Sequence, residues 1–222
     1  MRGLAGLLVT IALALLPSNG FALGIGRRFS VSGGVGWTGG SNIGHVDANE
    51  TTSGGGSYTL FASDSELGDA TSVETTLGAR LSRLLHAELN VSYGQLDLRT
   101  HLSSDVEGIP DTDASESIGQ LTLEGSVLFD LAGLRLPRQT MPFLTAGGGY
   151  LRHLHQGRMF VETGTVFHAG GGLLMPLGSA AAADARSALR FDVKAMIRNG
   201  GAIPDDGPHV SPSLSASFVW KF

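Results

Sequence analysis

The chain of 222 residues contains no cysteine, which excludes a disulfide framework, a thiolate metal site and a thiol redox centre. Basic residues are also scarce: the chain has 15 Lys and Arg against 20 Asp and Glu, and its formal net charge is −5 with His neutral. No nucleic-acid partner is expected, since phosphate binding needs clustered Lys and Arg. Beyond the N-terminus no long apolar run resembles a transmembrane helix, because Gly, Ser or a charged residue interrupts each run.

The N-terminus has the pattern of a secretory signal peptide. Arg2 supplies a positive charge, Leu4–Leu16 an apolar stretch, and Gly20–Ala22 a small-x-small cleavage site. An N-terminal membrane anchor is the alternative, but 13 apolar residues are too few to cross roughly 30 Å as a helix. We therefore expect an exported protein with a signal peptide at residues 1–22 and one domain at residues 23–222.

Glycine is abundant, with 33 residues, and the glycines lie inside segments where apolar and polar residues alternate. A period of two predicts β-strands with one apolar and one polar face. Eight such segments can be marked: Arg27–Trp37, Thr71–Ser82, Leu85–Asp97, Ser117–Asp130, Met141–His153, Val161–Met175, Ser187–Arg198 and Ser211–Phe222.

The links between these segments alternate in kind. One set holds the long polar links Thr38–Ala70, Arg99–Glu116 and Asn199–Val210 and the shorter Leu154–Phe160; the other holds Arg83–Leu84, Leu131–Thr140 and Pro176–Arg186. Long loops at one end and tighter turns at the other are typical of transmembrane β-barrels. Within the first link, Ser57–Ser63 is predicted to form part of a strand that extends the hairpin.

The third segment changes phase after Tyr93, because Leu96 and Leu98 fall on its polar parity. We interpret this change as the strand leaving the bilayer or as a β-bulge.

The apolar rows of the second, third, fourth, seventh and eighth segments contain no Asp, Glu, Lys or Arg. A lipid-facing surface excludes such residues, because Arg or Lys at the midplane costs about 2–4 kcal/mol. The alternative is a soluble β-sandwich or lipocalin-like barrel, which would bury the apolar row and expose the charged one. The sequence favours an all-β protein, an eight-stranded antiparallel up-and-down transmembrane β-barrel.

With these features the chain resembles the OmpA-like transmembrane domain, the family of eight-stranded outer-membrane β-barrels. The resemblance rests on the signal, the eight segments, the P-F-L-T-A-G-G-G-Y run at Pro142–Tyr150 and the terminal F-V-W-K-F. It implies a location in the bacterial outer membrane, with membrane lipid as a partner. It also implies that the outer-membrane assembly machinery recognises an assembly signal made of Phe218, Trp220 and Phe222.

The polar rows contain charged residues that would face the barrel interior. An eight-stranded barrel is just wide enough for side chains to fill it, and a buried charge without a partner is costly. We therefore predict a lumenal ion-pair network that plugs the barrel; a narrow ion path along the same residues is the alternative. The candidate residues are Glu74, Arg80, Glu88, Glu124, Arg190, Asp192 and Lys194.

Other candidate sites are weaker. His153 and His155 lie two apart at a strand end, and we interpret them as surface rim residues, because zinc needs three or four ligands. His168 is expected to point inward and to form hydrogen bonds within the lumen. Gly34–Gly39 matches G-x-G-x-x-G but opens no helix, so a dinucleotide site is not indicated.

No cofactor, metal site or catalytic residue is therefore expected. The expected function is non-catalytic: the protein supports the envelope or presents surface loops whose ligand the sequence does not reveal. A small channel for ions or hydrophobic solutes is the alternative, and a lipid-modifying enzyme is the third possibility.

Overall fold

The computed structural model describes residues 28–51, 55, 57–103, 112–134, 136–154, 161–178, 185–200 and 208–222. The signal peptide expected at residues 1–22 lies outside them. Within these ranges the chain is almost entirely β-strand, and no helix there is long and apolar enough to span a membrane. The strands are β1 (Phe29–Thr38), β2 (Ser41–Thr51), β3 (Ser57–Leu67), β4 (Ala70–Arg80), β5 (Leu85–Ser103), β6 (Thr112–Asp130), β7 (Met141–Leu154), β8 (Val161–Pro176), β9 (Ser187–Gly200) and β10 (His209–Lys221), with a short 3₁₀ turn, η1 (Pro137–Gln139).

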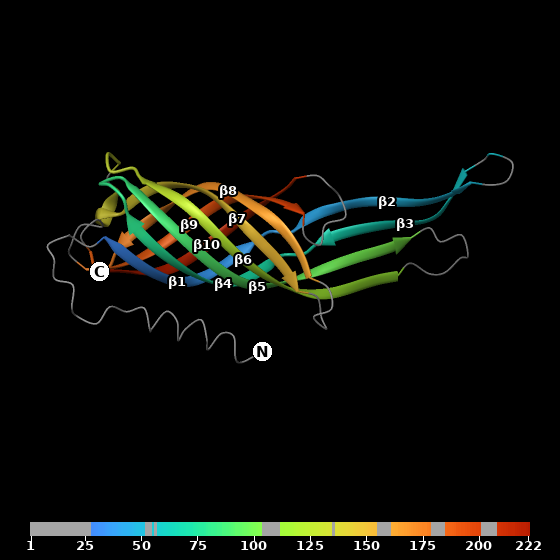
Figure 1. Ribbon diagram of the computed structural model, residues 1–222, viewed down its shortest axis with the longest axis horizontal. Helices are drawn as coiled ribbons and strands as arrows, with labels where there is room; N and C mark the ends of the chain where they lie inside the picture. The colour runs from blue at the N-terminus through green and yellow to red at the C-terminus, as the bar shows by residue number, and fades with distance from the viewer. Residues whose placement is uncertain are drawn as a thin grey trace.

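Eight of these strands, β1 and β4 to β10, form a closed antiparallel barrel (Figure 1). Each strand pairs with its neighbour in this series, and β10 closes the barrel against β1 from Ser30↔Lys221 to Thr38↔Ser213. Closure leaves no exposed strand edge around the barrel wall, which is a requirement for a sheet in hydrocarbon. We call the end where β4–β5, β6–β7 and β8–β9 connect the turn end, and the opposite end the loop end.

The loop end continues into a sheet extension made of β2, β3 and the distal parts of β5 and β6 (Figure 1). The prediction that Ser57–Ser63 lies on a strand is confirmed, because β3 spans it. The prediction that Arg99–Glu116 is only a link is wrong, since β5 continues to Ser103 and β6 begins at Thr112. Residues 98–103 contain neither Gly nor Pro, so nothing ends the antiparallel ladder there.

The phase change after Tyr93 is not a β-bulge, and the interpretation that the strand leaves the bilayer there stays a prediction. The β5–β6 ladder runs without interruption from Leu85↔Phe129 to Leu102↔Thr112. Leu96 therefore stays on the inward row with Glu88, and its side chain is only 2% exposed. The chemistry of the inward row changes from polar to apolar, while the backbone keeps its register.

The barrel has its apolar side chains outside and its polar ones inside. On β9, Val193 is 61% exposed, whereas its neighbour Asp192 is 4% exposed. The same inversion holds on β6, where Leu123 is exposed and Thr122 is buried. A water-soluble barrel would show the reverse, so the predicted transmembrane barrel fold is confirmed and the soluble alternative is wrong.

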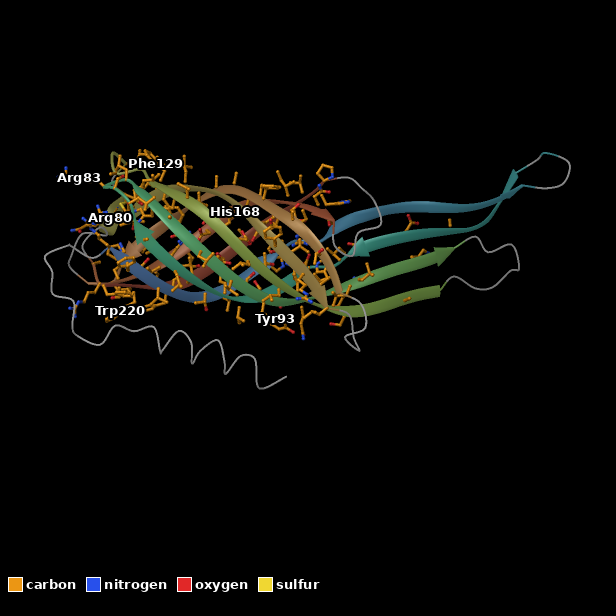
Figure 2. All side chains as sticks on the ribbon, in the orientation of Figure 1. Arg80, Arg83, Tyr93, Phe129, His168 and Trp220 are labelled. Carbon is orange, nitrogen blue, oxygen red and sulfur yellow. The ribbon has the colours of Figure 1, made fainter. Side chains whose placement is uncertain are left out.

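Aromatic side chains mark both ends of the apolar wall, as in membrane barrels generally. Phe29, Phe129 and Trp220 are exposed at the turn end, and Tyr150 is exposed towards the loop end. Figure 2 shows Phe129 and Trp220 at one end of the barrel and Tyr93 at the other. The strands between these two levels therefore form the membrane-spanning wall.

Val193→Arg should impair folding into bilayers, because residue 193 lies in the middle of the outward row of β9. The expected cost is about 2–4 kcal/mol at the bilayer midplane, against about 0–1 kcal/mol near the interface. The matched control is Gln95→Arg, since Gln95 is exposed on β5 near the loop end of the barrel, where it pairs with Thr71 at the start of β4. Folded yield in lipid vesicles, measured as the heat-modifiable band on a gel, checks this; equal yields of the two variants would contradict the assigned wall.

Candidate functional site in the barrel lumen

Arg190 organises the charged part of the lumen. Its Nη1 donates to Glu88 Oε1 at 2.6 Å, while Nε and Nη2 donate to the two carboxylate oxygens of Asp192 at 2.9 and 2.8 Å. These contacts join β9 to β5 across the barrel interior. The two parallel bonds to Asp192 form a bidentate fork, the strongest arrangement between Arg and a carboxylate.

The Arg190 guanidinium also lies over the ring of Phe143, 4.8 Å from the ring centroid. Phe143 on β7 is paired with Gly172 on β8, and Gly172 is paired in turn with Asp192 on β9. A Cβ atom at Gly172 would overlap both the Phe143 ring and the carbonyl oxygen of Phe191. Glycine at this position therefore makes room for the ring against which Arg190 packs.

Two histidine–carboxylate contacts extend the polar interior. Nδ1 of His168 lies 2.6 Å from Oε2 of Glu124, and both side chains are buried. His86 Nε2 lies 2.9 Å from Oδ2 of Asp130, nearer to the turn end. The expectation that His168 points inward agrees with its position, and Figure 2 shows it in the middle of the barrel.

The structure brings together three of the seven candidate network residues, Glu88, Arg190 and Asp192, in direct ion pairs. Glu74 and Lys194 line the same central cavity as these residues, but no direct ion pair joins the two in the described part of the chain. Glu124 contacts His168 instead of a cation of the network.

Arg80 lies outside the network, which corrects its predicted place. Its Nε and Nη2 donate to the carbonyl oxygens of Ser82 and Arg83, at 3.0 and 3.2 Å, in the β4–β5 turn. Because Arg80 is the last residue of β4, its side chain reaches the turn more easily than the lumen centre.

Buried apolar clusters lie towards both ends of the barrel. At the turn end, Phe143 and Val219 belong to one buried cluster, completed by Leu128, Leu174 and Ala188. At the loop end, one cluster consists of Leu67, Ala70, Leu96 and Ile118, and a second of Leu151, Val166 and Met196. Glu88, Arg190 and Asp192 thus lie between these clusters along the barrel, whereas the buried Arg198 lies at the level of the loop-end clusters.

The cavities left between these side chains are small. Two lie in the barrel interior, with volumes of about 40 and 10 Å³, and their linings share Glu74, Glu124 and Lys194. A third, of about 50 Å³, opens at the turn end between Arg28 and Phe143. Spaces of this size hold one or a few water molecules.

Two further buried residues of the loop-end lumen were missed. Arg198 is 2% exposed, and its Nε has no hydrogen-bond partner among the described residues. His153 is fully buried, with Nε2 at 3.1 Å from Gln120 Oε1, so its interpretation as a surface rim residue is wrong. His155 lies outside the described residues. Arg198 and His153 both occupy the inward parity of their strands, which was the available signal.

No group of three or more His, Asp or Glu side chains is placed to hold a metal ion in the part of the chain that the structure describes. A hollow of about 850 Å³ lies on the outer wall across β9, β10, β1, β4 and β5. Apolar side chains such as Val35, Trp37 and Phe191 line it, so acyl chains of the bilayer would fill it.

No protein-family model matches the chain, and no curated protein matches it either. Solved structures do. The crystal structure of the outer membrane protein OprG from Pseudomonas aeruginosa matches with a TM-score of 0.53 and 12% identity, over 89% of this chain and 96% of that one. Neisserial surface protein A (NspA) matches with a TM-score of 0.52 and 14% identity, over 87% and 97% of the two chains. The chain has the fold of these outer-membrane barrels. The predicted resemblance in fold is thereby confirmed.

Replacing Arg190 with Met should destabilise the folded barrel by about 3–5 kcal/mol, because Glu88 and Asp192 would be left buried without their cation. Urea unfolding in lipid vesicles, followed by tryptophan fluorescence, measures the change. The triple variant R190M/E88Q/D192N should recover most of the lost stability, because neither carboxylate is then left buried without its cation. Arg152→Met, at an exposed position, is the control and should leave the stability unchanged. A single variant as stable as the parent would show that the ion pairs do not support the fold.

Proposed function

We propose that the protein is an integral barrel of the bacterial outer membrane, with a closed lumen and a non-catalytic role in the envelope. The observation that supports this most is the lumen filled by side chains, in which Glu88, Arg190 and Asp192 are ion-paired and buried apolar clusters lie towards both ends. The loop-end sheet extension would then project from the cell surface, and the turn end would face the periplasm.

The membrane location is supported by the exposed apolar wall, by its aromatic ends and by the fold shared with OprG and NspA. The N-terminal signal pattern further indicates that the protein is exported from the cytoplasm. Outer-membrane lipid is then the principal partner, and it contacts the outward rows of all eight barrel strands.

A non-catalytic role is supported by the contacts of the lumenal carboxylates and by the composition of the outward rows. The carboxylates Glu88, Asp192 and Asp130 are engaged with Arg190 and His86. The outward rows of the strands place no His, Asp or Glu at the level of the lipid acyl chains among the described residues. A hydrolase or acyltransferase acting on lipid would need a nucleophile and a base at such a point.

The closed lumen distinguishes this proposal from a channel. Folded protein in a planar bilayer should give no steady single-channel steps, because side chains fill the lumen and leave interior cavities of only about 40 and 10 Å³. The double variant F143A/L96A, which removes a large side chain from an apolar cluster at each end, serves as the comparison and should raise the conductance. Large, steady steps from the parent protein would overturn the plug and favour the channel.

We further propose that Phe218, Trp220 and Phe222 form the assembly signal read by the outer-membrane assembly machinery. The Phe222 ring stacks on Phe29 with centroids 6.4 Å apart, and their backbones exchange hydrogen bonds of 2.9 and 3.2 Å. These backbone bonds do not need the ring.

Phe222→Ala should therefore lower surface abundance in cells severalfold while the purified variant still refolds in detergent. Phe129→Ala, which removes an exposed ring at the same end on β6, is the control and should assemble normally. Unchanged abundance of the Phe222 variant, or equal losses in both, would contradict the signal role.

A further inference from the structure

Charge is distributed unequally between the two ends of the barrel. The four loop-side links defined above, from Thr38–Ala70 to Asn199–Val210, contain twelve acidic and two basic residues. The three turn-side links contain four basic residues and one acidic residue. The exclusion of charge from the lipid-facing wall does not explain why the two ends differ in sign. The excess of basic residues at the turn end is therefore a separate feature of the chain.

Two of the four basic residues of the turn-side links, Arg83 and Arg186, lie near three basic residues of the adjoining strand ends. We call the five together the turn-end basic rim: Arg28, Arg80, Arg83, Arg186 and Lys221. Main-chain hydrogen bonds fix their spacing. The Arg80 amide donates to the Arg28 carbonyl at 2.7 Å, and the Lys221 amide donates to the Arg186 carbonyl, also at 2.7 Å. The rim thus follows the ends of four neighbouring strands in the order β4, β1, β10 and β9.

The rim lies directly beyond the aromatic level of the wall. Phe29 follows Arg28 and stacks on Phe222, while Trp220 precedes Lys221 and is paired with Ser187, next to Arg186. Figure 2 shows Arg80 and Arg83 at the same end of the barrel as Phe129 and Trp220. Because aromatic girdles mark the membrane interface, these cationic groups lie at head-group depth.

Three residues of the rim, Arg28, Arg83 and Arg186, are exposed and so available for an external anion. The two carboxylates that line the adjoining mouth, Asp130 and Glu88, already contact His86 and Arg190. Arg80 is held by two turn carbonyls, which orients part of the rim without neutralising its charge.

We propose that the turn-end basic rim binds the phosphate groups of anionic phospholipids in the leaflet on that side of the membrane. This inference rests on the membrane placement proposed above. Lys and Arg close to a membrane surface attract anionic lipid, and their attraction is screened beyond a Debye length. The occupant is a lipid because the rim borders the hydrocarbon-facing wall, where acyl chains can pack on Phe29 and Trp220.

The two tryptophans of the chain allow a direct test, because Trp220 lies beside the rim and Trp37 near the loop end. The W37F protein, with Trp220 as its reporter, is folded into phosphatidylcholine vesicles containing brominated phosphatidylglycerol or, at equal content, brominated phosphatidylcholine. Quenching of Trp220 should show a preference for the anionic lipid of about tenfold, lost at high salt.

Adding R28Q/R186Q should reduce this preference to near parity, whereas the matched loop-end pair R99Q/R152Q should leave it unchanged. In a W220F protein, Trp37 should show no such preference. Equal quenching of Trp220 by both lipids, or equal losses in both Arg pairs, would overturn the inference while leaving the barrel intact. Absence of quenching by any brominated lipid would instead refute membrane insertion, and with it the proposed function.

Discussion

The whole structure depends on one constraint: the outer wall lies in hydrocarbon, where a backbone N–H or C=O group has no water to bond. A sheet meets this constraint only by closing on itself, which is why β10 pairs with β1 along nine residue pairs. The same constraint fixes the direction of every side chain, since exposed positions such as Val193 must be apolar and charge must point inward. Fold and lumen chemistry are therefore two results of a single requirement.

An eight-stranded barrel leaves an interior that side chains fill, so inward charge has to be neutralised locally. Arg190 meets this need by contacting Glu88 across the barrel and Asp192 on its own strand. Gly172 contributes by its small size, because it admits the Phe143 ring on which the guanidinium rests. Buried apolar clusters lie on either side of these ion pairs along the barrel.

The strict alternation of apolar and polar residues allowed the strands and the two faces of the wall to be predicted, because successive side chains of a strand point to opposite faces of the sheet. It also located Glu88, Arg190 and Asp192 on the lumen side. Alternation could not show which inward residues meet, since contacts such as His168–Glu124 depend on register between strands distant in sequence. Leu96 misled the prediction for a related reason: an apolar inward residue looks like a change of phase unless the neighbouring strands are known to supply Leu67 and Ile118 beside it.

The lumen and the two ends of the barrel obey different physical rules. Inside, charges such as Arg190 and Glu88 are paired within the chain, so they contribute to stability and offer little to an external ligand. At the ends, charged side chains can contact water and lipid head groups instead of other residues of the chain. The sign of their charge is therefore not fixed by a partner in the fold. The links at the loop end are mostly acidic and those at the turn end mostly basic, so charged groups that could meet an external ligand lie at the two ends of the barrel.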